Sequence, residues 1–332
     1  MTVRVGINGL GRIGRMVLRR VLTSDTDVEV VGINDVAPVA ELAHLLAYDS
    51  TYGPLDRHVY SVPDAIVVDG TTIPVSACRE PERIGWRAVG ADVVIESSGL
   101  FRTREQAGGH LKGGASRVLI SAPGKDVDFT VVMGVNGDQY DADVHEVISN
   151  ASCTTNCVAP MVKVLDDAFG VSKAFMTTVH GYTNDQVVLD APHKDLRRAR
   201  SAGVNIIPTS TGAARATGHV LPDLEGRIDG AAMRVPVDDG SLTDLTVLLT
   251  REVTADEVNE AFANAAAGEL SGIVRYTDHP IVSRDIIGDP ASCVFDSLLT
   301  QVNGNFVKVF GWYDNEWGYA CRLVEFAEHI GQ

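Results

Sequence analysis

A glycine-rich run close to the N-terminus constrains the fold more strongly than any other feature of the chain. Residues 9–14 read Gly-Leu-Gly-Arg-Ile-Gly. They follow an apolar strand pattern at 3–8 and open a helical pattern at 12–22. A second apolar strand pattern, 28–33, is followed by Asp35, which lies 21 residues beyond the last glycine of the run. This order and spacing predict a dinucleotide-binding unit of the Rossmann type.

The chemistry of the glycine run favours a bound pyrophosphate. Glycines let the backbone approach the phosphates, and the amides and dipole at the helix N-terminus stabilise their negative charge. Asp35 could accept hydrogen bonds from the hydroxyls of the adenosine ribose. A 2′-phosphate would put a second negative charge beside this carboxylate, so we expect NAD to be the preferred cofactor.

The remainder of the first half alternates between strand and helix patterns, which is typical of a parallel sheet covered on both faces. These patterns lie at 39–48, 58–76, 92–95, 103–112 and 118–121, with 103–112 expected as one helical stretch. The pattern changes near residue 150, and strand patterns then predominate. They lie at 174–180, 230–237, 242–249, 292–299 and 305–313, with helix patterns at 153–169, 255–267 and 316–330.

The expected fold class is therefore α/β, with a Rossmann-type parallel-sheet domain and an α+β catalytic domain whose sheet is mostly antiparallel. We place the dinucleotide-binding domain at 1–151 and the catalytic domain at 152–315. The helix at 255–267 begins with the capping box Thr254-x-x-Glu257. The polar, Arg-rich segment 181–204 lacks periodicity, and loops of this length in compact domains are usually functional.

Charge and composition exclude several classes of protein. Asp and Glu number 44 against 28 Lys and Arg, and the net charge of −16 repels nucleic-acid phosphates. No apolar run approaches the ~20 residues that span a bilayer. The five cysteines are irregularly spaced and include no Cys-x-x-Cys pair, which disfavours a disulfide scaffold or a metal site. The N-terminus shows no signal-peptide pattern, so we expect a cytoplasmic protein. The chain has 6 Lys and 22 Arg, and this preference for Arg fits either a surface adapted to high salt or a GC-rich genome.

One cysteine lies where a strand pattern passes into a helix. The first turn of a helix favours a thiolate at Cys153, and the neighbouring Ser and Thr hydroxyls make the surroundings polar. Cys157 is one helical turn further on and is expected to point into the core. His180 ends a strand pattern before a glycine, a suitable position for acid–base work, but spacing alone does not pair it with Cys153.

Four motifs in the second half carry a family resemblance. They are Ala151-Ser-Cys-Thr-Thr-Asn156, Thr178-Val-His-Gly-Tyr-Thr183, Ile207-Pro-Thr-Ser-Thr-Gly-Ala213 and Gly311-Trp-Tyr-Asp-Asn-Glu-Trp-Gly-Tyr319. In this order they resemble the phosphorylating glyceraldehyde-3-phosphate dehydrogenase family of the bacterial and eukaryotic type, and the resemblance extends from residue 5 to about 325. It implies that D-glyceraldehyde 3-phosphate is oxidised to 1,3-bisphosphoglycerate in glycolysis and gluconeogenesis.

The resemblance also implies roles for the residues of the catalytic domain. Cys153 would attack the aldehyde, His180 would take the proton, and inorganic phosphate would cleave the resulting thioester. Thr183 and Arg234 would bind the substrate phosphate, and Arg198 would serve the same anion region. The attacking phosphate would be bound by Ser152, Thr154, Thr211 and Gly212.

For the cofactor, the resemblance assigns Asn315 to the nicotinamide carboxamide. It places the following residues along the dinucleotide groove: Asn8, Gly9, Gly11, Arg12, Ile13, Gly14, Asp35, Arg79, Gly99 and Ser121. Val36 and Ala191 depart from NAD-specific relatives, so we expect NADP as a weaker second cofactor. No metal ion is expected.

The resemblance further implies a homotetramer through the loop 190–201, and a terminal helix, 316–332, that completes the first domain. Small-molecule substrates and inorganic phosphate are then the expected partners, with no nucleic acid and no membrane. The main alternative is erythrose-4-phosphate dehydrogenase, which uses the same thiol and fold. An acylating semialdehyde dehydrogenase would lack this set of Thr and Arg residues.

Overall fold

The computed structural model describes residues 2–331, which form two compact units. Within that range, the first unit consists of residues 2–131, 137–151 and 320–331, and the second of residues 132–136 and 152–319. In the described part of the chain, no helix is long and apolar enough to cross a membrane.

The first unit is built around one sheet with the strand order β3-β4-β5-β2-β1-β6-β7-β9-β8. From β5 to β8 every neighbouring pair is parallel, and only β3, β4 and β5 pair antiparallel. The parallel sheet expected from the alternating patterns is therefore confirmed. The strands are β1 (Val3–Asn8), β2 (Val28–Asn34), β3 (Val59–Val62), β4 (Ala65–Val68), β5 (Thr71–Ser76), β6 (Val93–Glu96), β7 (Arg117–Ile120), β8 (Phe129–Thr130) and β9 (Val147–Ser149).

The helices of the first unit are mostly short. They are α1 (Arg12–Thr23), α2 (Val39–Ala47), α3 (Trp86–Val89), α4 (Arg104–Ala107) and α5 (Gly109–Lys112), with 3-10 turns η1 (Pro81–Arg83) and η2 (Gly137–Gln139). The expectation of one helix over 103–112 was wrong, because α4 ends at Ala107, α5 begins at Gly109, and Gly108 lies between them. A Cβ atom at Gly109 would lie 2.9 Å from Pro81 Cβ, so close packing against η1 favours glycine there.

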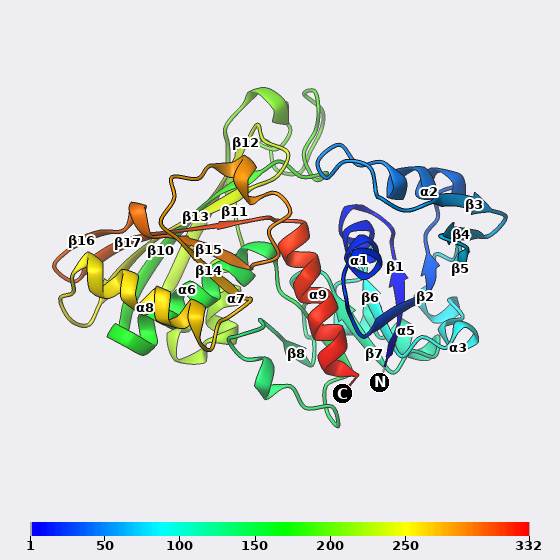
Figure 1. Cartoon of the computed structure of the whole chain (residues 1–332), viewed down its shortest axis with the longest axis horizontal. Helices are drawn as coiled ribbons and strands as arrows, with labels where there is room; N and C mark the ends of the chain where they lie inside the picture. Colours follow the sequence, from blue (N-terminus) through cyan, green and yellow to red (C-terminus); the bar gives the residue numbers. More distant parts are fainter. Residues whose placement is uncertain (1, 332) are drawn as a thin grey trace. The chain divides into compact units, whose positions relative to one another are not determined.

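The terminal helix α9 (Trp317–Ile330) returns to the first unit from Ala320 onward. Its Glu328 carboxylate accepts hydrogen bonds from the Asp27 amide, at 2.8 Å, and from the Thr26 hydroxyl. The end of α9 thus lies beside the start of β1 (Figure 1).

The second unit contains a sheet with the order β11-β12-β10-β13-β17-β15-β14, in which β16 also pairs with β17. Only the pairs β10–β12 and β14–β15 are parallel, which confirms the mostly antiparallel sheet. The strands are β10 (Val171–Gly181), β11 (Ile207–Ser210), β12 (Ile228–Val235), β13 (Ser241–Leu249), β14 (Val274–Thr277), β15 (Cys293–Asp296), β16 (Gln301–Asn303) and β17 (Phe306–Tyr313).

Helices α6, α7 and α8 pack with this sheet (Figure 1). They are α6 (Cys153–Phe169), α7 (Ala213–Val220) and α8 (Ala255–Ala267), with 3-10 turns η3 (Ala202–Val204), η4 (Pro222–Leu224), η5 (Ser283–Ile286) and η6 (Ser297–Leu299). The capping box of α8 is confirmed: Glu257 N donates to Thr254 Oγ1 and Thr254 N donates to Glu257 Oε2.

The strand expected at 292–299 is shorter than predicted. It ends at Asp296, whose carboxylate accepts a hydrogen bond from Leu298 N and so starts the turn η6. Ser297 Oγ then donates to Thr277 O at 2.8 Å, which holds this turn against β14.

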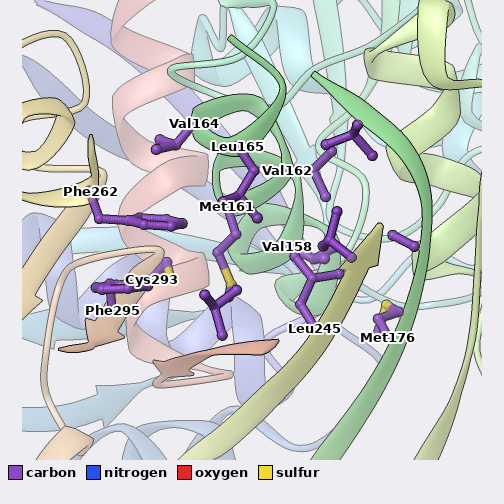
Figure 2. Close-up of a cluster of buried hydrophobic side chains, with 14 of the residues drawn as sticks. Val158, Met161, Val162, Val164, Leu165, Met176, Leu245, Phe262, Cys293 and Phe295 are labelled. Atoms are coloured by element: carbon purple, nitrogen blue, oxygen red, sulfur yellow. The ribbon is translucent and has the colours of Figure 1, made fainter. Parts of the chain in front are cut away.

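The core of the second unit lies between α6, α8 and the sheet. Phe262 of α8 and Phe295 of β15 are fully buried, and their rings stack at 3.8 Å with an angle of 8° (Figure 2). Met161 of α6 belongs to the same cluster. Cys153 is the first residue of the same helix. The packing of α6 in this core therefore also holds Cys153 in position.

Replacing Phe262 with alanine tests this packing. We expect Phe262→Ala to lower the free energy of unfolding by about 3–5 kcal/mol, because it removes a stacked ring from a closed core. The matched control is Leu298→Ala, whose side chain is 56% exposed in the same unit and should cost less than about 0.5 kcal/mol. The free energy of unfolding of both variants is measured by urea denaturation at one protein concentration. Equal losses of stability would contradict the assignment of Phe262 to the core.

Candidate active site

A pocket of about 250 Å³ lies where three neighbouring strands of the first unit, β1, β2 and β6, end. Carboxyl ends of parallel strands are where ligands bind in open α/β sheets. Five of the residues that line the pocket were predicted as cofactor residues: Asn8, Gly9, Gly11, Asp35 and Arg79. The others were not predicted: Asn34, Val36, Cys78, Ser97, Ser98, Leu100 and Phe101. Their position directly after β2, β5 and β6 is the signal that could have identified them.

The three glycines of the first turn have different roles. A Cβ at Gly9, whose φ is +91°, would lie 2.6 Å from the Ser98 backbone, and a Cβ at Gly14 would lie 2.1 Å from Gly9 O. These two glycines are therefore needed for packing. A Cβ at Gly11, the N-cap of α1, would meet no atom within 4 Å. The open space at Gly11, beside the first amides of α1, fits a pyrophosphate.

Asp35 also supports this turn. Its Oδ2 accepts a hydrogen bond from Leu10 N at 2.7 Å, and its Oδ1 accepts one from Ala37 N at 2.9 Å. Each carboxylate oxygen can accept more than one hydrogen bond, so Asp35 can still bind ribose hydroxyls.

The other predicted cofactor residues of this unit lie outside the pocket lining. They are Arg12, Ile13, Gly14, Gly99 and Ser121. The Arg12 guanidinium pairs with the Asp49 carboxylate. Asn8 lines the pocket, but its amide is held from both sides: Nδ2 donates to Glu96 Oε2, and Oδ1 accepts from Asn34 Nδ2 at 2.8 Å.

In the second unit, Cys153 is the first residue of α6. Ser152 is the N-cap of this helix, and its Oγ accepts a hydrogen bond from Thr155 N at 3.1 Å. Cys153 Sγ lies 3.4 Å from His180 Nε2. The structure thus brings the two predicted catalytic residues together, which spacing alone could not show. Cys157 is fully buried, as expected.

The contacts of His180 Nδ1 include one acceptor and one donor. Gly181 O, at 2.7 Å, can only accept, whereas Arg234 Nη1, at 2.6 Å, can only donate and also donates to Gly181 O. We assign the proton to Nδ1, because the contact with the carbonyl oxygen requires it. The lone pair of Nε2 therefore faces Cys153 Sγ and can accept the thiol proton. His180 is 4% exposed, so little water competes for this interaction.

Arg234 lies beside His180 because β10 and β12 pair in parallel with these two residues in register. Arg234 Nη1 donates to Gly181 O at 3.0 Å and lies 2.6 Å from His180 Nδ1. The Nε atom of Arg234 is buried without a hydrogen-bond partner in the described chain. A buried guanidinium with an unused donor fits an anion, because charge-assisted hydrogen bonds would satisfy it.

Burial acts against charge on the thiol and the imidazole when each is considered alone. It raises the pKa of Cys153 to about 11, and the nearby Arg234 charge only partly offsets this effect. Burial, followed by the Arg234 charge, lowers the pKa of His180 to about 3. For each group considered alone, burial therefore works against the thiolate and the imidazolium.

Tyr313 is a site residue to which the sequence assigned no role, although it lies within the motif 311–319. Its hydroxyl lies 2.9 Å from Thr154 Oγ1 and 2.7 Å from Thr178 Oγ1, and its ring meets the His180 ring edge-on with 5.9 Å between centroids. Its place in that motif, at the end of the strand pattern 305–313, is the signal that could have identified it. Thr154 Oγ1 lies 4.0 Å from Cys153 Sγ, so Tyr313 holds the threonine beside the thiol.

The remaining predicted anion residues have local partners. Thr211 Oγ1 accepts a hydrogen bond from Ala213 N at 3.2 Å, and Gly212 is the N-cap of α7. Thr183 N donates to Gln186 Oε1 at 3.3 Å. Arg198 pairs with Asp185, and its charge also lowers the pKa of His180, as a cation near that imidazole would.

A dinucleotide pocket in one unit and a histidine-paired thiol in the other define an NAD-dependent oxidoreductase with a reactive cysteine. Comparison with known families agrees. Residues 3–104 match the NAD binding domain of glyceraldehyde 3-phosphate dehydrogenase, and residues 152–315 match its C-terminal domain. The chain belongs to the glyceraldehyde-3-phosphate dehydrogenase family.

Individual relatives match over the whole chain. The chain is 60% identical to a glyceraldehyde-3-phosphate dehydrogenase of Streptomyces coelicolor, covering 100% of this chain and 99% of the relative. It is 58% identical to glyceraldehyde-3-phosphate dehydrogenase 2 of Streptomyces avermitilis and 54% identical to glyceraldehyde-3-phosphate dehydrogenase 1 of Bacillus subtilis, with the same coverage in both cases.

Residues 2–331 contain no group of three or more His, Cys, Asp or Glu side chains that could hold a metal ion.

The geometry predicts how the thiol reacts when its histidine is removed. In His180→Asn the thiol must ionise alone, and with a pKa of about 11 roughly one part in ten thousand is thiolate at pH 7. Iodoacetamide should therefore modify Cys153 at least ~10-fold more slowly than in the wild type at pH 7. The rate should then rise roughly tenfold per pH unit up to pH 10. An unchanged rate at pH 7 would show that Nε2 does not accept the thiol proton.

Proposed function

We propose that the chain oxidises D-glyceraldehyde 3-phosphate to 1,3-bisphosphoglycerate with NAD and inorganic phosphate, as a step of glycolysis and gluconeogenesis. The observation that carries this proposal is the 3.4 Å contact between Cys153 Sγ and the unprotonated Nε2 of His180, beside the buried guanidinium of Arg234. A nucleophile, its base and an anion partner are then held on adjacent elements.

Cys153 and His180 carry the covalent step in this proposal. Sγ forms a bond to the aldehyde carbon while its proton moves to Nε2, because neither group is stable as an isolated buried charge. The proton then passes from Nε2 to the carbonyl oxygen, which becomes the hydroxyl of a hemithioacetal. His180 then takes the proton of that hydroxyl as the carbon is oxidised to a thioester.

Inorganic phosphate completes the reaction by attacking the thioester carbon. The C–S bond breaks, an acyl phosphate leaves, and Cys153 regains its proton. The unused Nε donor of Arg234 supports an anion site here, and Arg198 adds a second guanidinium nearby. We assign Arg234 and Thr183, with Arg198, to the substrate phosphate. The attacking phosphate is assigned to Ser152, Thr154, Thr211 and Gly212.

The residues that would hold NAD fit that cofactor. The space at Gly11 accepts the pyrophosphate, and Asp35 accepts the ribose hydroxyls. Asn315 would donate to the nicotinamide carboxamide. When bound, the nicotinamide ring accepts the hydride from the substrate carbon. We retain the assignments of Arg12, Ile13, Gly14, Gly99 and Ser121 as part of this proposal, although they lie outside the pocket lining.

We further propose that the chain forms a homotetramer. The loop 190–201 is part of a longer segment with apolar side chains exposed to solvent: Val188, Leu189, Leu196, Val204 and Ile206. One face of the second sheet also exposes Phe175, Leu248 and Phe306, which share that face through the pairing of β10, β13 and β17. Exposed apolar surface on this scale supports contacts with other copies of the chain.

The proposed domain organisation assigns 1–151 and the terminal helix 316–332 to the cofactor and 152–315 to catalysis. We place the protein in the cytoplasm, because its five cysteines are all free thiols, which suits a reducing compartment.

The reaction is tested by measuring NADH formation with glyceraldehyde 3-phosphate and with erythrose 4-phosphate. We expect kcat/KM to be at least tenfold higher for the triose, and turnover to require inorganic phosphate. Preference for the tetrose would favour erythrose-4-phosphate dehydrogenase, and phosphate-independent turnover would overturn the acyl-phosphate step.

Replacing the nucleophile separates chemistry from binding. Cys153→Ala should abolish turnover and keep the dissociation constant for NAD within about twofold of the wild type, because the dinucleotide pocket does not include residue 153. Cys157→Ala is the control, since Cys157 is buried behind the site and its replacement should leave most activity. Near wild-type turnover in Cys153→Ala would place the nucleophile elsewhere.

Asp35 provides the test of cofactor choice. The wild type should favour NAD with measurable NADP activity, because the carboxylate repels a 2′-phosphate and 1.4 kcal/mol already gives a tenfold preference. Asp35→Gly should shift the ratio of kcat/KM for NAD over NADP at least ~10-fold toward NADP, with Arg79 of the same pocket free to bind the phosphate. Asp35→Asn removes the negative charge but keeps a side-chain oxygen that can accept the hydrogen bond from Leu10 N. An unchanged ratio in both variants would remove Asp35 as the selector.

A further inference from the structure

Asn315 is a buried polar side chain that is only partly satisfied by the protein. Asn315 is only 5% exposed to solvent. Its Oδ1 accepts a hydrogen bond, whereas its Nδ2 has no hydrogen-bond partner among residues 2–331. This nitrogen is therefore left open to a ligand that accepts a hydrogen bond.

The orientation of the Asn315 amide is determined by Ser241. Ser241 Oγ is 3.2 Å from Gly181 N, a group that can only donate, so Oγ accepts there. The single hydroxyl proton of Ser241 is then free to donate to Asn315 Oδ1, at 2.6 Å. Because Oδ1 is held in this way, Nδ2 must be the free end of the amide. Ser241 itself is fully buried at the start of β13.

The backbone of Asn315 is held independently of its side chain. Asn315 N donates to Asp239 Oδ1 at 3.1 Å, and the same oxygen accepts from Gly240 N at 2.8 Å. Loss of the Ser241 hydroxyl would therefore release the amide group while leaving the backbone of residue 315 in place.

The same hydrogen-bond chain continues to the catalytic base. Gly181 N donates to Ser241, and Gly181 O accepts from His180 Nδ1 at 2.7 Å. The backbone of one residue, Gly181, thus connects the orientation of the imidazole with the orientation of the Asn315 amide.

We propose that Ser241 is a positioning residue, which orients Asn315 so that Nδ2 donates to the carboxamide oxygen of a nicotinamide dinucleotide. The proposal rests on the proposed function in taking NAD as the ligand and Asn315 as the residue that binds its carboxamide. Ser241 is fully buried, so it acts through Asn315.

The test compares the dissociation constants of two ligands, measured by tryptophan fluorescence or calorimetry. The ligands are NAD and ADP-ribose, which lacks the nicotinamide ring. Ser241→Ala should weaken NAD about three- to tenfold, since one hydrogen bond is at stake. ADP-ribose should bind as to the wild type. Equal weakening of both ligands would indicate a merely structural role and overturn the proposal.

A double-mutant cycle identifies the route of the effect. In an Asn315→Ala background, the Ser241→Ala change should alter NAD binding less than about twofold, because the residue through which Ser241 acts is gone. The same loss in both backgrounds would contradict the proposal. An Asn315→Ala variant that binds NAD as the wild type does would also overturn it, while leaving turnover of glyceraldehyde 3-phosphate as a separate test of the function.

A matched pair of variants covers the case in which Ser241→Ala does not fold. Ser241→Thr and Ser241→Val have almost the same shape and differ in the hydroxyl. Ser241→Thr should keep NAD binding closer to the wild type, and Ser241→Val should lose it relative to ADP-ribose. Equal NAD affinity in these two variants would overturn the proposal.

Discussion

The parallel pairing of β10 with β12 is the constraint on which the active site depends. It places His180 and Arg234 in register, so a base and a guanidinium stand side by side on neighbouring strands. The start of α6 then brings Cys153 to within 3.4 Å of that base. Because strand register is defined by many backbone hydrogen bonds and by burial of one face, this arrangement is rigid before any substrate binds.

Burial determines how such a site can work. Withdrawing Cys153 and His180 from water disfavours charge on each of them, and Arg234 makes an imidazolium still less favourable. The proton therefore has to move between two atoms already in contact, in step with bond formation, so that no isolated charge is left in the buried site. Tyr313 and Thr154 complete the polar wall around the thiol.

Long periodic segments and the glycine turn were predictable, because their patterns depend on local sequence. The paired sheets, α1, α6 and α8 therefore follow from the sequence, and Asp35 was found by its distance from the glycines. The short strands β11 and β14 were not predicted, because four residues beside other polar segments carry little pattern. The break between α4 and α5 was also missed, and close packing of Gly109 against Pro81 is a contact that periodicity does not reveal. Contacts between distant segments could not be predicted either. The Cys153–His180 contact, the Tyr313–Thr154 contact and the Ser241–Asn315 hydrogen bond join residues that are 27 to 159 positions apart.

The most direct test of the central claim is to trap the acyl-enzyme. Wild-type protein is incubated with glyceraldehyde 3-phosphate and NAD in phosphate-free buffer, and the modified peptide is located by mass spectrometry. The account predicts a phosphoglyceroyl thioester on Cys153, which disappears when inorganic phosphate is added and acyl phosphate forms. An adduct on another residue, or a Cys153 adduct that phosphate does not release, would contradict it.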